Sequence, residues 1–305
     1  MTNAIFRGRP AWVLAALLWA LAAAPAWACT LWGAAGPAAD GGTLVAKNRD
    51  WKPDHRQELR RLRPSGGFHA IALTAVGGEE PGVKAGVNTE GLVIVSATAG
   101  QAPAAARRKP GAVKGLTAHL LARCATVAEV LGAIERFGRP VFYLIGDRRE
   151  IAVIEVAPDG RRSVTRTSEG TLSHTNHYLA AGLPAPAVPP GASSFLRQAR
   201  IESLLGAGGR PFTFEDFIRL SADRDAGPDN SIWRTGSRPG RTRTLATWIV
   251  SVPASGSPQL FVKMVDPGAP ERLCRLSVAE ALAAAPGEDG VVVELQGALC
   301  RPPPR

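Results

Sequence analysis

One cysteine near the start of the chain, Cys29, has the surroundings of a catalytic nucleophile. It follows two arginines, an uncharged apolar run at residues 11–24, and small residues at Ala26 and Ala28, which together form a secretory signal. Removal of residues 1–28 would make Cys29 the first residue of the mature protein. Its α-amine, with an unperturbed pKa of about 7.7–8.0, could then accept the thiol proton, and the thiolate is the form that attacks a carbonyl carbon. We therefore expect an N-terminal cysteine nucleophile whose base is its own amine.

A strand that returns toward Cys29 carries the next candidates. Apolar segments flank an Asp-Gly-Gly cluster, which favours a β-hairpin. The midpoint between Cys29 and Asp50 falls inside this turn, so antiparallel pairing would bring Asp50 beside Cys29, where its carboxylate could orient the amine. Alternation along the strand would place Lys47 and Arg49 on one face and Asn48 on the other. A cation on the Cys29 side would favour the thiolate.

These residues resemble a known family. Cys29-Thr30, the Asp-Gly turn and the sequence Ala-Lys-Asn-Arg-Asp-Trp at 46–51 are similar to the start of the N-terminal-nucleophile (Ntn) hydrolases of the choloylglycine hydrolase, penicillin V acylase and isopenicillin-N acyltransferase group. Three later segments are similar in the family's order: 86–92 with an Asn-containing turn, 174–178 with a Thr-Asn pair, and 193–200 with a Ser-Ser helix start. The resemblance implies an αββα sandwich and a linear amide C–N hydrolase.

The resemblance also implies roles for four residues. Cys29 would be the nucleophile and, through its amine, the base. Asp50 would orient that amine. Asn176 would donate a hydrogen bond to the oxyanion, and Arg197 would organise charge in the pocket.

Two positions depart from the bile-salt branch of this family. Lys47 stands where that branch has arginine, and lysine lacks arginine's bidentate geometry toward carboxylates. The second amide side chain that contributes to the oxyanion site of that branch falls near Thr98, so a backbone N–H could serve instead. Lys47, Arg49 and Thr98 are therefore candidate contacts for the thiolate or the substrate.

The remaining pattern predicts an α+β fold, with two mainly antiparallel sheets, in a single catalytic domain at residues 29–305. Sheet, helices, sheet, helices and sheet follow one another along the chain, an order in which helices cover the faces of antiparallel sheets. Extended segments are expected at residues 30–32, 43–49, 68–76, 82–88, 92–97, 141–145, 151–156, 163–166, 171–174, 245–252 and 260–265. Helical patterns are expected at residues 113–137, broken or continuous, and at 194–205, 214–220 and 277–285.

Charge and composition exclude several classes of function. The net charge is +10, but the arginines are scattered without a basic helix face, so we expect no nucleic-acid binding. The apolar run at 11–24 is shorter than the ~20 residues that span a bilayer, so we expect no stable membrane insertion. His174 and His177 lack a cluster of further ligands, so we expect no metal and no cofactor. The sequence is compatible with an oligomer.

The four cysteines indicate one disulfide. If Cys29 is a free thiol, three cysteines are left, and Cys274 with Cys300 is the favoured pair because both lie in the C-terminal segment. Cys124 lies in an apolar helical stretch and is expected in the core.

The sequence therefore predicts an enzyme exported to the periplasm or the extracellular space, which hydrolyses a small-molecule N-acyl amide through an acyl-enzyme on Cys29. One alternative is an acyltransferase that uses the same mechanism. Another is a catalytically silent or lipid-anchored binding protein on the same scaffold, in which Cys29 is an acylation site. A disulfide is a further alternative role for Cys29.

Overall fold

The computed structural model describes residues 28–107, 113–184, 189–283 and 300–301. The expected signal peptide lies outside these residues except for Ala28. Parts of two expected loops, at 108–112 and 185–188, and the last two residues of the expected helix at 277–285 also lie outside them.

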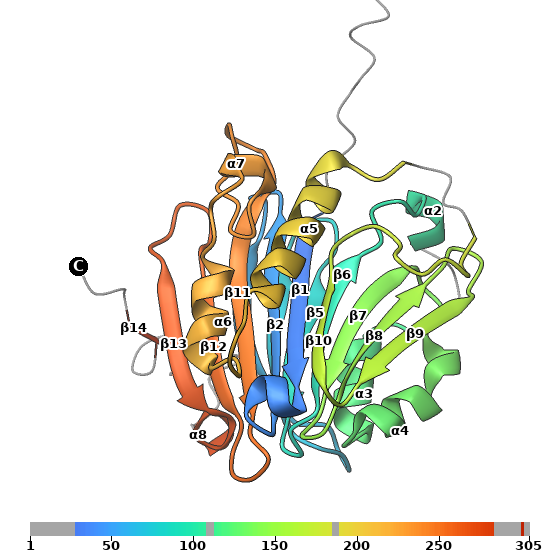
Figure 1. Ribbon diagram of the computed structural model, residues 1–305, viewed down its shortest axis with the longest axis vertical. Coiled ribbons are helices and arrows are strands. Elements are labelled where there is room, and N and C mark those ends of the chain that lie inside the picture. The colour runs from blue at the N-terminus through green and yellow to red at the C-terminus, as the bar shows by residue number, and fades with distance from the viewer. Residues whose placement is uncertain (1–27, 108–112, 185–188, 284–299, 302–305) are drawn as a thin grey trace, which may run out of the picture.

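Among the described residues, two seven-stranded antiparallel sheets form the centre of the fold (Figure 1). The first sheet has the order β10-β1-β2-β11-β12-β13-β14. Its strands are β1 (Ala28–Ala35), β2 (Thr43–Trp51), β10 (Gly170–His174), β11 (Arg243–Val252), β12 (Gln259–Met264), β13 (Arg272–Ser277) and β14 (Cys300–Arg301). The neighbouring strands β1 and β2 are covered on both faces, and every side chain of β2 is buried.

The second sheet follows the chain without a crossover, in the order β3-β4-β5-β6-β7-β8-β9. Its strands are β3 (Arg56–Leu62), β4 (Ala70–Val76), β5 (Gly82–Asn88), β6 (Val93–Thr98), β7 (Val141–Gly146), β8 (Ile151–Val156) and β9 (Arg162–Thr167). The expected turns at Gly91 and after Gly146 join β5 to β6 and β7 to β8.

Helices cover the outer faces of the two sheets (Figure 1). On the first sheet lie α5 (Ala192–Gly206) and α6 (Phe214–Ser221), and on the second lie α3 (Leu116–Arg123) and α4 (Val127–Gly132). The shorter elements are α2 (Ala104–Arg107), α7 (Gly227–Asn230), α8 (Val278–Ala283), η1 (Gly36–Ala39) and η2 (Ile134–Arg136). The order helix, sheet, sheet, helix is the expected αββα sandwich.

Three apolar layers hold this sandwich together, one between the sheets and one under the helices on each outer face. Leu31 and Val45 of the first sheet pack between the sheets, in one cluster with Leu144 of the second. On the other face of the first sheet, Trp32 packs toward α6, where its ring lies 6.1 Å from that of Phe217. Adjacent residues of β1 thus face opposite layers, which follows from the two-residue period of a strand.

Some elements differ from the sequence prediction. The helical stretch 113–137 has the broken form, one of the two expected, because Cys124 is extended and Thr126 caps a new helix by accepting the N–H of Glu129. The strands β3 and β13 were not predicted. Both are rich in arginine, as Arg-Gln-Glu-Leu-Arg-Arg-Leu and Arg-Leu-Cys-Arg-Leu-Ser, and such sequences do not stand out as strands from hydrophobicity alone.

The described cysteines include free thiols and a disulfide-bonded residue. Cys274 is disulfide-bonded, and Cys300 lies directly opposite it in the β13–β14 ladder. Cys29 and Cys124 are free and buried. None of the helices in the described ranges is long and apolar enough to cross a membrane.

Candidate active site

The hairpin of β1 and β2 sets the geometry around Cys29. Its turn consists of η1 followed by Asp40 in the left-handed conformation, with φ of 52°. The strands pair so that Cys29 lies opposite Arg49 and Ala28 lies opposite Asp50. This register is one residue away from the symmetric pairing that the sequence suggested. Because facing residues share a side of the sheet, Arg49 lies on the side of Cys29 and Asp50 lies on the other.

The side of Cys29 is cationic, because Lys47 and Arg49 both lie on it. Alternation along the strand predicted that these two residues share a face, and the observed register places that face on the side of Cys29. The ammonium of Lys47 donates to the carbonyl oxygen of Lys84, at 3.1 Å, and to that of Ser96. Burial lowers the pKa of Lys47 to about 8, and the nearby Cys29 opposes this shift. Lys47 is thus a buried cation that two carbonyl groups hold in place.

Arg49 is fixed by a second set of neighbours. Its Nε donates to Oε1 of Gln57 at 2.9 Å, and its Nη2 lies 2.7 Å from Nε2 of His55. The guanidinium also stacks over the ring of Trp51, 5.2 Å from its centroid. Burial lowers the pKa of Arg49, and Cys29 again opposes the shift.

Asn176 contacts the backbone of Cys29. In the described chain the nitrogen of Cys29 is still joined to Ala28, and it donates to Oδ1 of Asn176 at 2.8 Å. The Nδ2 group of Asn176 donates to the carbonyl oxygen of Thr98 at 2.9 Å. Thr98 therefore takes part through its backbone, and Asn176 bridges the two sheets at Cys29.

Arg197 joins these groups from α5. Its side chain is fully buried, and Nη1 donates to the carbonyl oxygen of Cys29 at 2.7 Å and to Oγ1 of Thr30 at 2.9 Å. Its Nη2 donates to Oδ1 of Asn176 at 3.0 Å. Burial lowers the pKa of Arg197 to about 10, and Asp50 opposes this shift. The guanidinium thus fixes the backbone of Cys29 and the orientation of the Asn176 amide.

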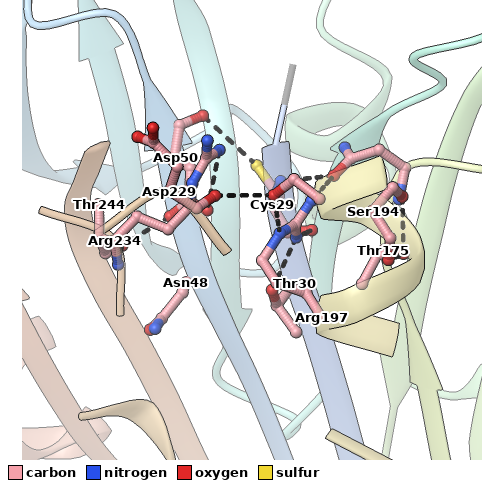
Figure 2. A network of polar contacts seen from close by, with 12 residues as sticks. Cys29, Thr30, Asn48, Asp50, Thr175, Ser194, Arg197, Asp229, Arg234 and Thr244 are labelled. Carbon is pink, nitrogen blue, oxygen red and sulfur yellow. Dashed lines mark hydrogen bonds and ion pairs between the residues drawn. The ribbon is translucent and has the colours of Figure 1, made fainter. Parts of the chain in front are cut away.

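Asp50 lies on the opposite side of Cys29 from Ser194 in Figure 2. Its Oδ1 accepts a hydrogen bond from Oγ1 of Thr244 at 2.7 Å, and its Oδ2 lies 3.9 Å from Nη1 of Arg234. Burial raises the pKa of Asp50, and Arg234 and Arg197 act against this shift. Oδ2 has no hydrogen-bond partner among the described residues. One oxygen of the carboxylate therefore accepts a hydrogen bond from Thr244. The other oxygen has only the ion pair with Arg234 and can accept a hydrogen bond from a further donor.

A group of hydroxyl and imidazole side chains supports Asn176. Oγ of Ser194, on α5, accepts the backbone N–H of Asn176 at 2.9 Å and lies 2.9 Å from Oγ1 of Thr175 (Figure 2). Nδ1 of His177 lies 2.8 Å from the same hydroxyl oxygen. Burial, with contributions from His174 and Arg197, lowers the pKa of His177 to about 4. Within the described residues no cluster of ligands could hold a metal ion.

Cys29 opens into a cavity between the second sheet, α2 and α3. The cavity has a volume of about 980 Å³, including the part open to solvent. Lys47, Arg49, Thr98 and Cys29 line it, whereas Asp50, Asn176 and Arg197 do not. The predicted residues thus form two groups, one facing the cavity and one surrounding the backbone of Cys29.

Several residues of the site were not predicted. Thr244 lies directly opposite Asp50 because β11 pairs with β2, which joins residues far apart in sequence. Arg234 precedes β11 and is held beside Thr244 by two hydrogen bonds of its backbone. Lys84, also a cavity residue, lies on β5, where strand alternation could have marked it as a lone cation among small and apolar residues.

Comparisons with known proteins assign the family. Residues 38–258 match the model of the family described as acyl-coenzyme A:6-aminopenicillanic acid acyl-transferase, which is more than half of the chain. No curated protein matches the sequence. Among solved structures, the Caenorhabditis elegans ortholog of N-acylethanolamine-hydrolyzing acid amidase has a TM-score of 0.52 at 14% identity, over 74% of this chain and 94% of that one.

A mutant of the conjugated bile acid hydrolase from Clostridium perfringens has a TM-score of 0.51 at 13% identity, over 82% of this chain and 93% of that one. At such low identity these likenesses show the fold, which is the Ntn-hydrolase sandwich that the sequence predicted. The chain belongs to the acyl-coenzyme A:6-aminopenicillanic acid acyl-transferase family of Ntn hydrolases.

Proposed function

We propose that this protein is an exported amidase that cleaves a linear N-acyl amide through a thioester on Cys29. The observation that carries the proposal is the position of Cys29 itself. Its side chain lines the cavity and its backbone nitrogen donates to Asn176. Asp50, whose Oδ2 has no hydrogen-bond partner among the described residues, lies opposite the preceding residue in the hairpin. Removal of residues 1–28 would convert that nitrogen into an α-amine, which is the base that the thiol needs.

The reaction then follows from these groups. The α-amine takes the thiol proton, and Sγ of Cys29 attacks the amide carbon to form a tetrahedral oxyanion. The C–N bond breaks as the α-ammonium returns the proton to the leaving amine, and a thioester is left on Cys29. Water, deprotonated by the α-amine, cleaves the thioester and releases the carboxylic acid, which restores the thiol.

The neighbours of Cys29 have distinct roles in this scheme. One N–H of the Asn176 amide donates to Thr98, and its second N–H is the donor assigned to the oxyanion. Oδ1 of Asn176 and Oδ2 of Asp50 accept from the α-ammonium. Arg197 acts as a positioning residue, because its guanidinium donates to Oδ1 of Asn176 and to the carbonyl oxygen of Cys29.

Intact-mass analysis after expression in an exporting host, followed by assays on a panel of N-acyl amides, tests the proposal. We expect a mass that begins at Cys29, with no lipid attached, and loss of turnover in Cys29→Ala. Cys124→Ala is the matched control, since Cys124 is a second free, buried thiol among the described residues and lies at the C-terminal end of α3, outside the cavity. A diacylglyceryl mass, or full activity in Cys29→Ala, would contradict the proposal.

Acyl transfer is the second candidate, and the description of the matching family favours it. The chemistry differs only in the last step, where an amine instead of water attacks the thioester. Adding an amine acceptor to the hydrolysis assay separates the two activities. An N-acyl product that accumulates at the expense of free acid would identify a transferase.

A further inference from the structure

The cavity at Cys29 has an excess of positive charge. Among its described lining residues are six cationic side chains and one carboxylate, that of Glu80. The cations come from several elements: Lys47, Arg49, Lys84, Arg107, Arg136 and Arg139. A cavity built only for an alkyl or aryl acyl chain would instead be lined mainly by apolar side chains.

Three of these cations, Lys47, Arg49 and Lys84, differ in the protein groups that they contact. Two carbonyl oxygens accept from Lys47, and Arg49 contacts Gln57, His55 and Trp51. Lys84 is different. Its ammonium has no hydrogen bond or ion pair with any residue of the described ranges, although it lines the same cavity and is only partly exposed. It is therefore the cation with donors left for a ligand.

Burying these cations together is unfavourable without a compensating anion. Burial lowers the pKa of Lys84 to about 7, and the charge of Arg49 adds to the shift. The Cys29 thiolate and the carboxylate of Glu80 could each supply one negative charge. The cations Lys47, Arg49 and Lys84 would still exceed these two charges, and a cationic cavity beside a nucleophile is typical of a site for an anionic ligand.

Resting on the proposed function, we propose that the substrate carries an anionic group, a carboxylate or a group of like charge, near its scissile amide, and that Lys84 binds this group. Arg49 adds a fixed positive charge beside Lys84. The other cations of the lining, Arg107, Arg136 and Arg139, raise the local concentration of anions at the cavity. The anion belongs either to the leaving amine or to the acyl chain. Both sources present the same chemistry to Lys84.

A different explanation of Lys84 is that it only stabilises the thiolate. In that case its removal would slow all substrates by the same factor. A residue that binds a substrate anion instead changes the ratio between charged and uncharged substrates. The two explanations therefore differ in selectivity and not merely in rate.

The experiment uses two pairs of amides. N-phenylacetylglycine and N-phenylacetylglycinamide differ in a charge on the amine side, and N-benzylsuccinamic acid and N-benzylsuccinamide differ in a charge on the acyl side. We expect the mature enzyme to have a higher kcat/KM for the charged member of one pair. Lys84→Met should reduce that preference about 10- to 100-fold, the usual effect of losing a charged hydrogen-bond donor. Lys84→Arg should restore part of it.

The control is Lys52→Met, because Lys52 lies outside the cavity, is 41% exposed and pairs with Glu79. It should leave both ratios unchanged. Calorimetry on Cys29→Ala with the same four amides measures binding without turnover, so it tests the anion site even if the proposed reaction is wrong. Binding of one acid at least tenfold tighter than its amide supports the proposal. Equal binding within both pairs, or an equal loss for charged and uncharged substrates in Lys84→Met, would overturn it.

Discussion

Replacing Thr244 with valine tests how Asp50 is held. Valine has nearly the shape of threonine, so the packing of this buried position changes little, but the hydroxyl group is lost. That hydroxyl donates to Oδ1 of Asp50 at 2.7 Å and accepts the backbone N–H of Arg234 at 2.9 Å. Both partners are buried, and neither can turn to water.

The expected loss of stability follows from these two contacts. A hydrogen bond to a charged acceptor contributes about 1.5–3 kcal/mol, and one between neutral groups about 0.5–1.5 kcal/mol. Thr244→Val should therefore lower the free energy of unfolding by about 2–4.5 kcal/mol, measured by urea denaturation. Thr244→Ser retains the hydroxyl and should lose much less.

The same change should affect catalysis. The Thr244 hydrogen bond lowers the pKa of Asp50, against the raising effect of burial. Without it, Asp50 would protonate at a higher pH, so the acid limb of the profile of kcat/KM against pH should move upward. Thr247→Val is the control on the same strand, because Thr247 donates to Asn48 and not to Asp50. It should lower stability without moving the acid limb.

One result would refute this reasoning. If the acid limb of Thr244→Val coincides with that of the unmodified protein, while Thr244→Val is folded under the assay conditions, Asp50 does not set the ionisation that matters. The α-amine would then be oriented by Asn176 alone.

Three further predictions concern the scaffold of the site. Gly42→Ala should strongly lower the melting temperature, because an added Cβ would clash with the carbonyl oxygen of Val252. The control Gly132→Ala has open space around the added Cβ, so it should raise the free energy of unfolding by about 0.5–1 kcal/mol. Because the pKa of His177 is lowered in the folded protein, the unfolded chain binds a proton first as the pH falls, and the free energy of unfolding should decrease between about pH 6.5 and 4. His177→Gln should reduce this dependence of the free energy of unfolding on pH, measured by denaturation curves across the same range. Arg197→Met should reduce kcat at least about 100-fold through the loss of its contacts to the cysteine carbonyl and the amide, with Arg197→Lys retaining an intermediate rate in single-turnover assays.

Much of the fold was predictable because the pattern repeats over long stretches. The hairpin strands around the Asp-Gly-Gly turn, the alternation of Lys47 and Arg49, and the order of strands and helices all follow from local periodicity. Cys29 stood out because a small-residue cleavage pattern precedes it. These features need no knowledge of how distant segments pack.

The surroundings of Asp50 were not predictable for the opposite reason. They depend on the exact register of the hairpin and on a third strand. Counting placed Asp50 beside Cys29, but the turn of η1 and Asp40 shifts the pairing by one residue and moves Asp50 to the other face. A one-residue shift reverses the side of every side chain in a strand, and Thr244 joins only through the pairing of β11 with β2.

The observed register also bears on activation. It places Lys47 and Arg49 on the side of the hairpin where the Cys29 side chain lies, and the carboxylate of Asp50 on the other side. Under the proposed function, cleavage before Cys29 alters the nitrogen of that residue and no side chain, since Asn176 and Arg197 already hold its flanking atoms. The thiol would then remain beside the cations while the new amine gains the available oxygen of Asp50. The precursor would thus be built for catalysis in every respect except its base.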